Sequence, residues 1–490
     1  MNDKANDIPE LQQHLKKSFT YTSPDIQNEI IDIISSNICD ALQRNVQTNK
    51  VWSLIADETS DILHQEQFSL CFRTVSEDLK IEEHFYKFAV VGHLYECIKQ
   101  NMFDAGFPVD TLFFQCYDGA SNMNGQYTGV AARVRELAPN GIYIHCHCHL
   151  LSLSLQNSCS KLTCIRNVLG TVNSIYNFIE ASPKRHAIFV ENQKLLIEGH
   201  RHRTIKLLSG TRWASRINAV KSILENFKAI ISTLEHLSQE SGKVASDAQS
   251  LLNNCATFEF LFYINLLHEI FSITSVLSDY LQSQKISIQQ AILSAKSCHK
   301  LVLSRRNDEF FELIWQCTSE STAALNLEPP KLPRKISVSR RFDDSAHRGD
   351  HPSTVESMYR ANFNEVLDTV ATQIDIRFNE NNLAPLQDIE SVFLHKLKPD
   401  VQETKINAIR EFYPQISGKV SAQLEVFKDM ATSNQPVLET NPTMEDIVTF
   451  FMEKKLQSVF PQVPIFICIT KLTITVYLMY NLFVADLLTS

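Results

Sequence analysis

Glycine is scarce in this chain, with 12 residues among 490, and tryptophan occurs three times. A loop-rich all-β fold needs many more turn residues, so the composition favours long helices. Basic residues are not in excess either, because 46 Lys and Arg stand against 55 Asp and Glu and give a net charge of -9. This balance argues against an overall basic nucleic-acid binder, although it is compatible with a local basic groove.

Two further absences concern location. No apolar segment follows the Met-Asn-Asp-Lys start, and the 12 cysteines are scattered along the chain. We therefore expect no secretory peptide and no disulfide scaffold, but a reducing compartment, the nucleus or alternatively the cytoplasm. Residues 463 to 490 are apolar but are interrupted by Lys471, Asn481 and Asp486. A core segment is favoured there over a membrane span, and no membrane partner is expected.

The hydrophobic content of 44% is enough for a sizeable core, and the length predicts more than one domain or a domain with a large insertion. Residues 1 to 50 contain an amphipathic helix around Pro24 to Leu42, which we expect to pack against the segment that follows. Its apolar side chains recur at helical spacing and are Ile26, Ile30, Ile33, Ile34 and Ile38.

Residues 51 to 160 change pattern and alternate short strands with helices. Three strands are followed by helix, strand, helix, strand and helix, which is the element order of a ribonuclease H-like α/β domain. The expected strands are 52 to 57, 68 to 75, 84 to 94, 111 to 118 and 141 to 148, and the expected helices are 95 to 105, 126 to 137 and one from His149.

Residues 161 to 455 are almost wholly helical in pattern, and residues 456 to 490 form a final segment. A stretch rich in Pro, Ser and charge at 328 to 352 predicts a loop or linker. Within it, KLPRKISVSRR at 331 to 341 holds five basic residues and no acid. It could contact a DNA backbone or act as a nuclear import signal, and a solvated loop is an equally good interpretation.

Two acids each follow an apolar run. Asp57 ends the first strand in IADETSD, and Asp118 ends the fourth in CYDGASNMNG. The element order places these two strands side by side and parallel in the middle of the sheet. The carboxylates would then face one another at one sheet edge, where two divalent cations could bridge them to a phosphate. The alternative is that both acids are strand-terminal caps without a metal.

The run HCHCH looks like a zinc site. On a strand, however, His145, His147 and His149 would point to one side and Cys146 and Cys148 to the other. Four ligands would not converge locally, so we predict no independent zinc site.

In TRWASR, Trp213 lies between Arg212 and Arg216. An aromatic ring can stack on an unpaired base while arginines attract phosphate, so these residues are candidates for DNA binding. A core position for Trp213 is the alternative.

The motifs IADETSD, CYDGASNM, HCHCHLLSLSL and TRWASR, in this order and spacing, resemble the core of hAT-superfamily transposases. The most similar branch comprises transposon-derived proteins related to the zinc-finger MYM-type family and to the repressor of the inhibitor of the protein kinase. The resemblance runs from about Leu11 to Phe460. It implies a ribonuclease H-like domain interrupted by a large all-helical insertion.

The resemblance also implies residue roles. The family has two Asp and one Glu that bind divalent metal for DNA cleavage and strand transfer, and Asp57 and Asp118 match the first two. Mg²⁺ or Mn²⁺ would be the cofactor of an active enzyme. Cys146 and His149 match a Cys-x-x-His motif beside the active site, and Trp213 matches an aromatic residue near the DNA end.

The chain departs from the family pattern near its end. Alignment of Leu472 to Val476 with the run before the third acid places the expected Glu near Leu482, where no acid stands. Glu58 and Asp61 are possible substitutes, but we expect them to be caps in a turn. The family's DNA-binding zinc finger is not recognised, and the dimerisation surface is expected to be incomplete.

The sequence therefore predicts a domesticated or truncated transposase-like protein, located in the nucleus, that binds DNA or protein partners without full catalytic competence. One alternative is an active metal-dependent DNA transposase whose third acid is supplied elsewhere. A second alternative is a pure protein-interaction scaffold.

Overall fold

The computed structural model describes most of the chain. The described residues are 23–49, 51–60, 66–90, 94–117, 129–145, 147–197, 204–208, 213–281, 288–332, 354–378, 384–394, 397–414, 416–434 and 443–476. Their contacts divide the chain into two compact units. The sheet unit is the described part of Met1–Tyr143 and Val392–Leu472, and the helical unit is the described part of Ile144–Ser391 and Thr473–Ala485.

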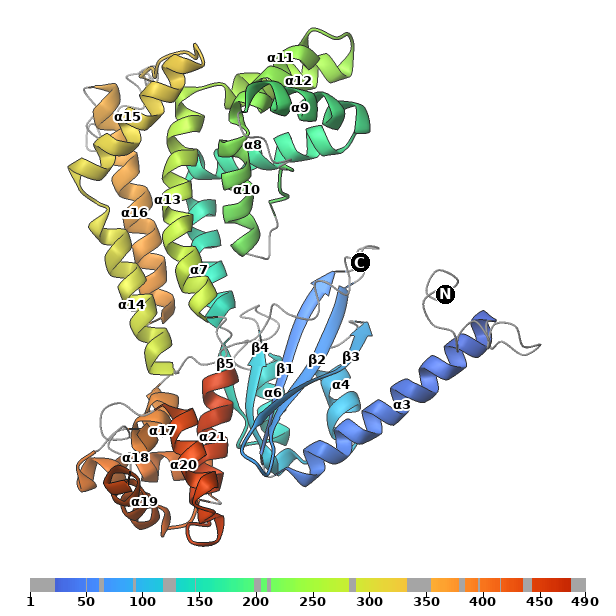
Figure 1. Ribbon diagram of the computed structural model, residues 1–490, viewed down its shortest axis with the longest axis vertical. Coiled ribbons are helices and arrows are strands. Elements are labelled where there is room, and N and C mark those ends of the chain that lie inside the picture. Colours follow the sequence, from blue (N-terminus) through green and yellow to red (C-terminus); the bar gives the residue numbers. More distant parts are fainter. Residues whose placement is uncertain are drawn as a thin grey trace, which may run out of the picture. The chain divides into compact units, whose positions relative to one another are not determined.

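The sheet has five strands in the order β3-β2-β1-β4-β5 (Figure 1). β1 pairs antiparallel with β2 and parallel with β4, and β2 pairs antiparallel with β3. The first and fourth strands are therefore parallel neighbours, as the element order predicts. The strands are β1 Trp52–Ser60, β2 Glu66–Val75, β3 Ile81–Val90, β4 Leu112–Tyr117 and β5 Ile142–His145.

The third strand differs from its prediction, because it ends at Val90 and Leu94 already begins a helix. The apolar run continues through this boundary, so its pattern alone did not mark the end of the strand. Helix α4 (Leu94–Ile98) then passes into a π-helical turn, η1 (Lys99–Phe103), in place of the single helix expected there.

One face of the sheet packs on a hydrophobic core. Alternate residues of β1 and β2 point to it, as expected for strands with one apolar face. Helices α4 and α6 (Val130–Leu137) supply the other side of this core. The indole Nε1 of Trp52 donates a hydrogen bond to the Pro108 carbonyl at 2.8 Å, so the one polar atom of this buried ring is satisfied. The cluster includes Leu54, Ala56, Phe68, Leu70, Phe72, Ile98, Met102, Phe107, Val130, Ala131 and Val134.

Helix α3 (Pro24–Thr48) confirms the helix expected in the N-terminal segment. The Ser23 side chain accepts a hydrogen bond from the Ile26 N–H, and Pro24 occupies the first turn, where its missing N–H costs nothing. The C-terminal half reaches the sheet, where Asn45 donates to Glu82 at 2.9 Å. Val46 is the buried residue of this helix, and the isoleucine stripe is exposed. The helix therefore packs against the following segment through its C-terminal half, as expected, whereas the isoleucines that predicted the helix do not take part in this packing among the described residues.

The other face of the sheet is covered by a segment far away in sequence. The Tyr413 hydroxyl donates to the Phe113 carbonyl of β4 at 3.1 Å, and the two rings lie 4.5 Å apart. Lys471 Nζ donates to the Leu79 carbonyl at 2.6 Å, in the turn that joins β2 and β3. The helices of this segment are α18 Pro399–Phe412, α19 Val420–Asn434, α20 Met444–Glu453, η7 Leu456–Ser458 and α21 Val463–Val476.

A half-buried lysine in this segment predicts a pH dependence of stability. Lys428 donates hydrogen bonds to the Val392 carbonyl and, at 3.4 Å, to Gln402 Oε1. Burial lowers the pKa of its ammonium group to about 8. Between pH 8 and the ordinary lysine pKa of 10.5, Lys428 is mostly neutral in the folded chain but still protonated in the unfolded chain. The unfolded state therefore binds more protons, and the contribution of Lys428 to the free energy of unfolding rises with pH.

From pH 7.5 to 10.5 we expect the free energy of unfolding of wild type to rise by about 2 kcal/mol relative to that of Lys428→Met. This value allows for partial solvent screening. Urea titrations under reducing conditions measure this difference. Lys419→Met, at an exposed lysine of the same segment, is the matched control and should show no such shift. A pH-independent difference for Lys428→Met would contradict the assignment.

The helical unit confirms the expected helical block. Helix α13 lies at its centre and packs on α7, α8, α10, α12, α14 and α15. Aromatic contacts fill this core, with the Phe258 ring 4.8 Å from Trp315 and the Phe262 ring 4.9 Å from Tyr359. The helices are α7 His147–Lys161, α8 Thr163–Glu180, α9 Pro183–Leu196, α10 Trp213–Glu225, α11 Phe227–Ser238, α12 Lys243–Cys255, α13 Phe258–Leu281, α14 Ile288–Ser304, α15 Asp308–Ala324 and α16 Val355–Phe378.

The compact units do not coincide with the boundaries expected from composition. The chain leaves the sheet unit after residue 143 and returns to it at residue 392, within α17 (Ala384–Leu394). Composition placed these boundaries near 160 and 455. The fold is thus a ribonuclease H-like α/β domain interrupted by a large helical insertion, and the returning segment is longer than expected.

Helix α13 is also long and apolar enough to cross a membrane by length and composition, but 61% of its apolar window is buried inside the protein. It is the core helix of the helical unit. In the apolar C-terminal stretch, Val463, Phe466, Ile467, Ile469 and Leu472 of α21 are fully buried, which confirms the expected core segment as far as residue 472. Residues 477 to 490 and most of the expected loop at 328 to 352 lie outside the described residues.

Candidate functional site

The two candidate acids occupy matching positions along neighbouring parallel strands. Asp57 lies within β1, which continues to Ser60 and does not end at Asp57 as expected, whereas Asp118 comes directly after the end of β4 at Tyr117. The register of β1 and β4 places Leu54 opposite Gln115 and Ile55 opposite Cys116. In sequence, Asp57 comes two residues after Ile55, and Asp118 comes two residues after Cys116. The side chain of Asp57 and all of Asp118 lie outside the described residues. The paired strands nevertheless run in the same direction toward both acids.

Buried polar groups hold the end of β4 in place. Gln115 is fully buried, and its Nε2 donates to the Ala131 carbonyl of α6 at 3.1 Å and to the Gly141 carbonyl before β5 at 2.8 Å. The Gln115 side chain therefore links β4 to α6 and to the start of β5, the two elements that follow it in the chain. Sequence reasoning missed Gln115 as a positioning residue, although a single amide in the buried run LFFQCY was the available signal.

The last residue of β4 is also rigidly placed. The Tyr117 ring is buried and stacks on Tyr143 of β5, with ring centroids 6.0 Å apart. Burial raises the pKa of the Tyr117 phenol well above its ordinary value, so this group stays neutral next to Asp118 in sequence. A firmly packed strand end is what a site needs if two carboxylates are to share an ion.

These strand ends suit a hard divalent cation, which prefers carboxylate oxygens, but a third ligand is not evident. No group of three or more His, Cys, Asp or Glu side chains is placed to hold a metal among the residues that the structure describes. Glu58 lies inside β1 and not in a turn, because the strand continues to Ser60, so its expected cap role is wrong. Asp61, the other possible substitute, lies outside the described residues.

The histidine run does not follow strand alternation. β5 ends at His145, and α7 begins at His147, so the alternation assumed for the whole run is wrong. The rings of His145 and His149 stack with centroids 6.0 Å apart. His147 is fully buried, with Nδ1 3.2 Å from the His145 carbonyl and its ring against Phe378. The described histidines thus pack on one another and on the helical core.

Cys146, the first residue of the Cys-x-x-His motif, lies outside the described residues. His149 itself is in the first turn of α7 and is partly exposed. Its role beside the active site stays a prediction.

The candidate DNA-binding residues belong to the helical unit. Trp213 is the first residue of α10, but its side chain and all of Arg212 lie outside the described residues. Arg216, one turn later, is 8% exposed. Burial raises the pKa of the Cys159 thiol to about 12, and the charge of Arg216 acts in the opposite direction, which places this guanidinium near the thiol inside the unit. A phosphate contact by Arg216 stays a prediction.

Comparisons with known proteins agree with this fold. Residues 2–129 match the family DUF4371, described as ZMYM1/FAM200, RNase-like domain. The chain is 23% identical over 382 residues to the human "52 kDa repressor of the inhibitor of the protein kinase" (Homo sapiens), covering 75% of this chain and 49% of the relative. It is 22% identical over 383 residues to the mouse protein of the same name (Mus musculus), covering 75% and 50%.

The fold and these matches define a protein with a ribonuclease H-like domain and a helical insertion. The resemblance to the branch related to the zinc-finger MYM-type proteins and to the repressor of the inhibitor of the protein kinase is confirmed. A transposase-derived origin is thereby supported. The chain spans about half the length of the curated relatives it matches.

Proposed function

We propose that this chain is a domesticated hAT-type transposase-like protein that binds DNA at the edge of the sheet where the pairing of β1 with β4 ends, and that it does not complete catalysis. The observation that carries this proposal is the parallel pairing of β1 and β4, with Ile55 opposite Cys116. It supports a shared site for Asp57 and Asp118. We place this function in the nucleus.

In this proposal Asp57 and Asp118 hold Mg²⁺ or Mn²⁺. The ion would neutralise the charge of a DNA phosphate drawn to the strand ends. Two carboxylates without a third ligand leave an ion poorly positioned, and misplacement is costly in phosphoryl transfer. Leu482, which aligns with the third acid of the family, is not a carboxylate. Binding without cleavage is the function that this ligand set supports best.

The name of the relatives also favours binding over cleavage. Both are called repressors, and a repressor acts by occupying a partner. Protein partners are therefore part of the proposal, together with DNA.

Loss of the Trp213 ring should weaken DNA binding. We expect Trp213→Ala to bind hairpin DNA with a 3′ single-stranded extension about 10- to 100-fold less tightly than wild type, because stacking on an unpaired base contributes about 1–3 kcal/mol. A fluorescence anisotropy titration in Mn²⁺ at fixed ionic strength measures this loss.

The matched control is Tyr280→Ala, which removes an exposed aromatic ring from α13 of the same unit and should leave the affinity unchanged. If neither wild type nor Trp213→Ala binds hairpin or single-stranded DNA, the DNA proposal fails and a protein-interaction scaffold takes its place. If wild type cleaves the hairpin, the inactive assignment fails.

A further inference from the structure

Helix α3 carries an apolar surface in the part of the helix that extends beyond the sheet (Figure 1). From Pro24 to Ile38 every residue except Gln27 is exposed. A helix of about 15 residues is marginal in water without packing, and β-branched side chains weaken it further. This segment therefore needs a partner for its apolar side. We call this side the isoleucine stripe, and it consists of Ile26, Ile30, Ile31, Ile33, Ile34 and Ile38, which are 37 to 60% exposed.

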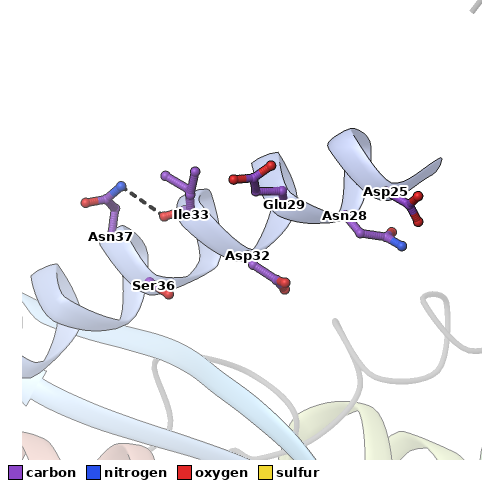
Figure 2. Close-up of a pocket in the computed structure, with 7 residues that line it drawn as sticks. All are labelled: Asp25, Asn28, Glu29, Asp32, Ile33, Ser36 and Asn37. Atoms are coloured by element: carbon purple, nitrogen blue, oxygen red, sulfur yellow. Dashed lines mark hydrogen bonds between the residues drawn. The ribbon is translucent and has the colours of Figure 1, made fainter. Parts of the chain in front are cut away.

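The acidic residues of this segment lie outside the isoleucine stripe. Asp32 is two positions from Ile30 and two from Ile34, and at about 100° per residue this separation places it on the opposite side of the helix. Figure 2 shows Asp25 and Asp32 pointing to the other side of the helix from Ile33. The stripe can therefore be covered by an apolar partner without burial of either carboxylate.

The isoleucine stripe is symmetric along the helix, and this symmetry indicates what covers it. If a second α3 lies antiparallel with its residue 32 level with residue 32 of the first, positions equally far from residue 32 stand level. All six isoleucines are then level with isoleucines, and Gln27 is level with Asn37. A closed two-fold interface requires such a self-complementary surface. The level pairs of isoleucines are Ile26 with Ile38, Ile30 with Ile34, and Ile31 with Ile33.

Packing geometry and charge both favour this orientation. Every fourth residue from Ile26 to Ile38 is an isoleucine, and two such ridges pack side by side when their helices cross at about 50°. In the antiparallel pair the acidic N-terminal half of one helix is level with the C-terminal half of the other, which holds Arg44 and one acid, Asp40. A parallel pair would place Asp25 and Glu29 beside the same residues of the second copy, and like charges repel.

We propose that α3 is a dimerisation helix, and that two copies of this chain associate through their isoleucine stripes in an antiparallel crossing centred on residue 32. Six isoleucine side chains at about half exposure make an apolar patch of roughly 400 Å², within the range that marks interaction sites. The isoleucines of two copies would bury about 800 Å², and flanking side chains add to this area, which is the size of a weak and reversible interface. The proposal is independent of DNA binding, because no residue of the candidate site takes part in it.

Sedimentation velocity of the full chain under reducing conditions tests this association. We expect wild type to change from monomer to dimer between about 1 and 100 μM, as suits a small interface. Ile34→Asp should weaken the association about 30-fold or more, because it places a charge at the centre of the apolar contact. Ser36→Asp adds the same charge on the opposite side of the helix and should associate like wild type, and unchanged hydrogen exchange of β2 in both variants shows that the sheet unit is intact. A wild type that stays monomeric at 100 μM, or an Ile34→Asp variant that associates like wild type, would overturn the proposal.

Mixtures of two variants test the antiparallel orientation. Ile30→Glu and Ile34→Lys should each be monomeric at concentrations where wild type is dimeric, and an equimolar mixture should recover the dimer, because the two substituted positions stand level in the antiparallel pair. A mixture of Ile30→Glu with Ile30→Lys should not recover it. Recovery in the second mixture alone indicates a parallel pair, and recovery in neither indicates a different contact, so each would overturn the proposal. Slow hydrogen exchange of residues 26 to 38 that does not depend on protein concentration would also overturn it, because the cover would then come from the same chain.

Discussion

Replacement of Tyr413 by alanine is expected to lower the free energy of unfolding of the sheet unit by about 3–5 kcal/mol, the cost of removing a large buried ring. The Tyr413 ring is fully buried, lies 4.5 Å from Phe113 and 6.2 Å from Phe114, and its hydroxyl bonds a carbonyl of β4. No residue of the intervening insertion is changed. Native-state hydrogen exchange of β4 and β2 measures the effect.

Tyr413→Phe is the matched control, since it keeps the ring and removes only the hydrogen bond. It should cost about 1 kcal/mol. If Tyr413→Ala left the exchange of β4 unchanged, the segment from residue 392 to 472 would not belong to the sheet unit. The assignment of a single α/β domain split by an insertion would then be wrong.

Local patterns predicted the elements of the sheet unit well. The alternation of apolar residues in FSLCFRTV predicted β2, and the order of strands and helices predicted that β1 and β4 are parallel neighbours. These features are encoded by short-range periodicity and by the limited ways of connecting strands. The end of β1 did not follow from this reasoning, because the strand continues past Asp57 to Ser60. The shared site for Asp57 and Asp118 stays a prediction.

Long-range packing was not accessible from the sequence. Amphipathic helices continue without interruption through residues 391 and 392, so composition did not show where the chain returns to the sheet. That return depends on the contact of Tyr413 with Phe113, 300 residues away. Likewise, the isoleucines of α3 predicted a helix but not the partner of its apolar face, because periodicity shows which face is apolar and not what covers it.

The end of β5 shows a third kind of difference. HCHCH has no residue that favours a strand end, and the change from strand to helix between His145 and His147 depends on packing of His147 against Phe378. Alternation was therefore applied beyond the end of the strand.

Loss of either candidate carboxylate should remove most of the affinity for Mn²⁺. We expect Asp57→Asn and Asp118→Asn each to bind Mn²⁺ about 100-fold or more weakly than wild type, because loss of even an outer-shell partner typically costs about 10- to 100-fold. If the two acids share the same ion, the double variant should be little weaker than either single variant. Isothermal titration calorimetry measures all four affinities.

Asp110→Asn is the matched control. Asp110 is exposed and precedes β4, at the opposite end of that strand from Asp118, so its loss should not change Mn²⁺ affinity. Additive losses in the double variant would indicate two separate weak sites. Wild-type affinity in either single variant would remove that acid from the site.

A crystal structure of the protein with Mn²⁺ tests the shared site most directly, because the anomalous signal of the metal locates it independently of the protein. We predict a bound ion with carboxylate oxygens of both Asp57 and Asp118 at about 2 Å, beyond the paired ends of β1 and β4. An ion held by one of the two acids alone, or Asp57 and Asp118 on opposite faces of the sheet, would contradict the proposed function.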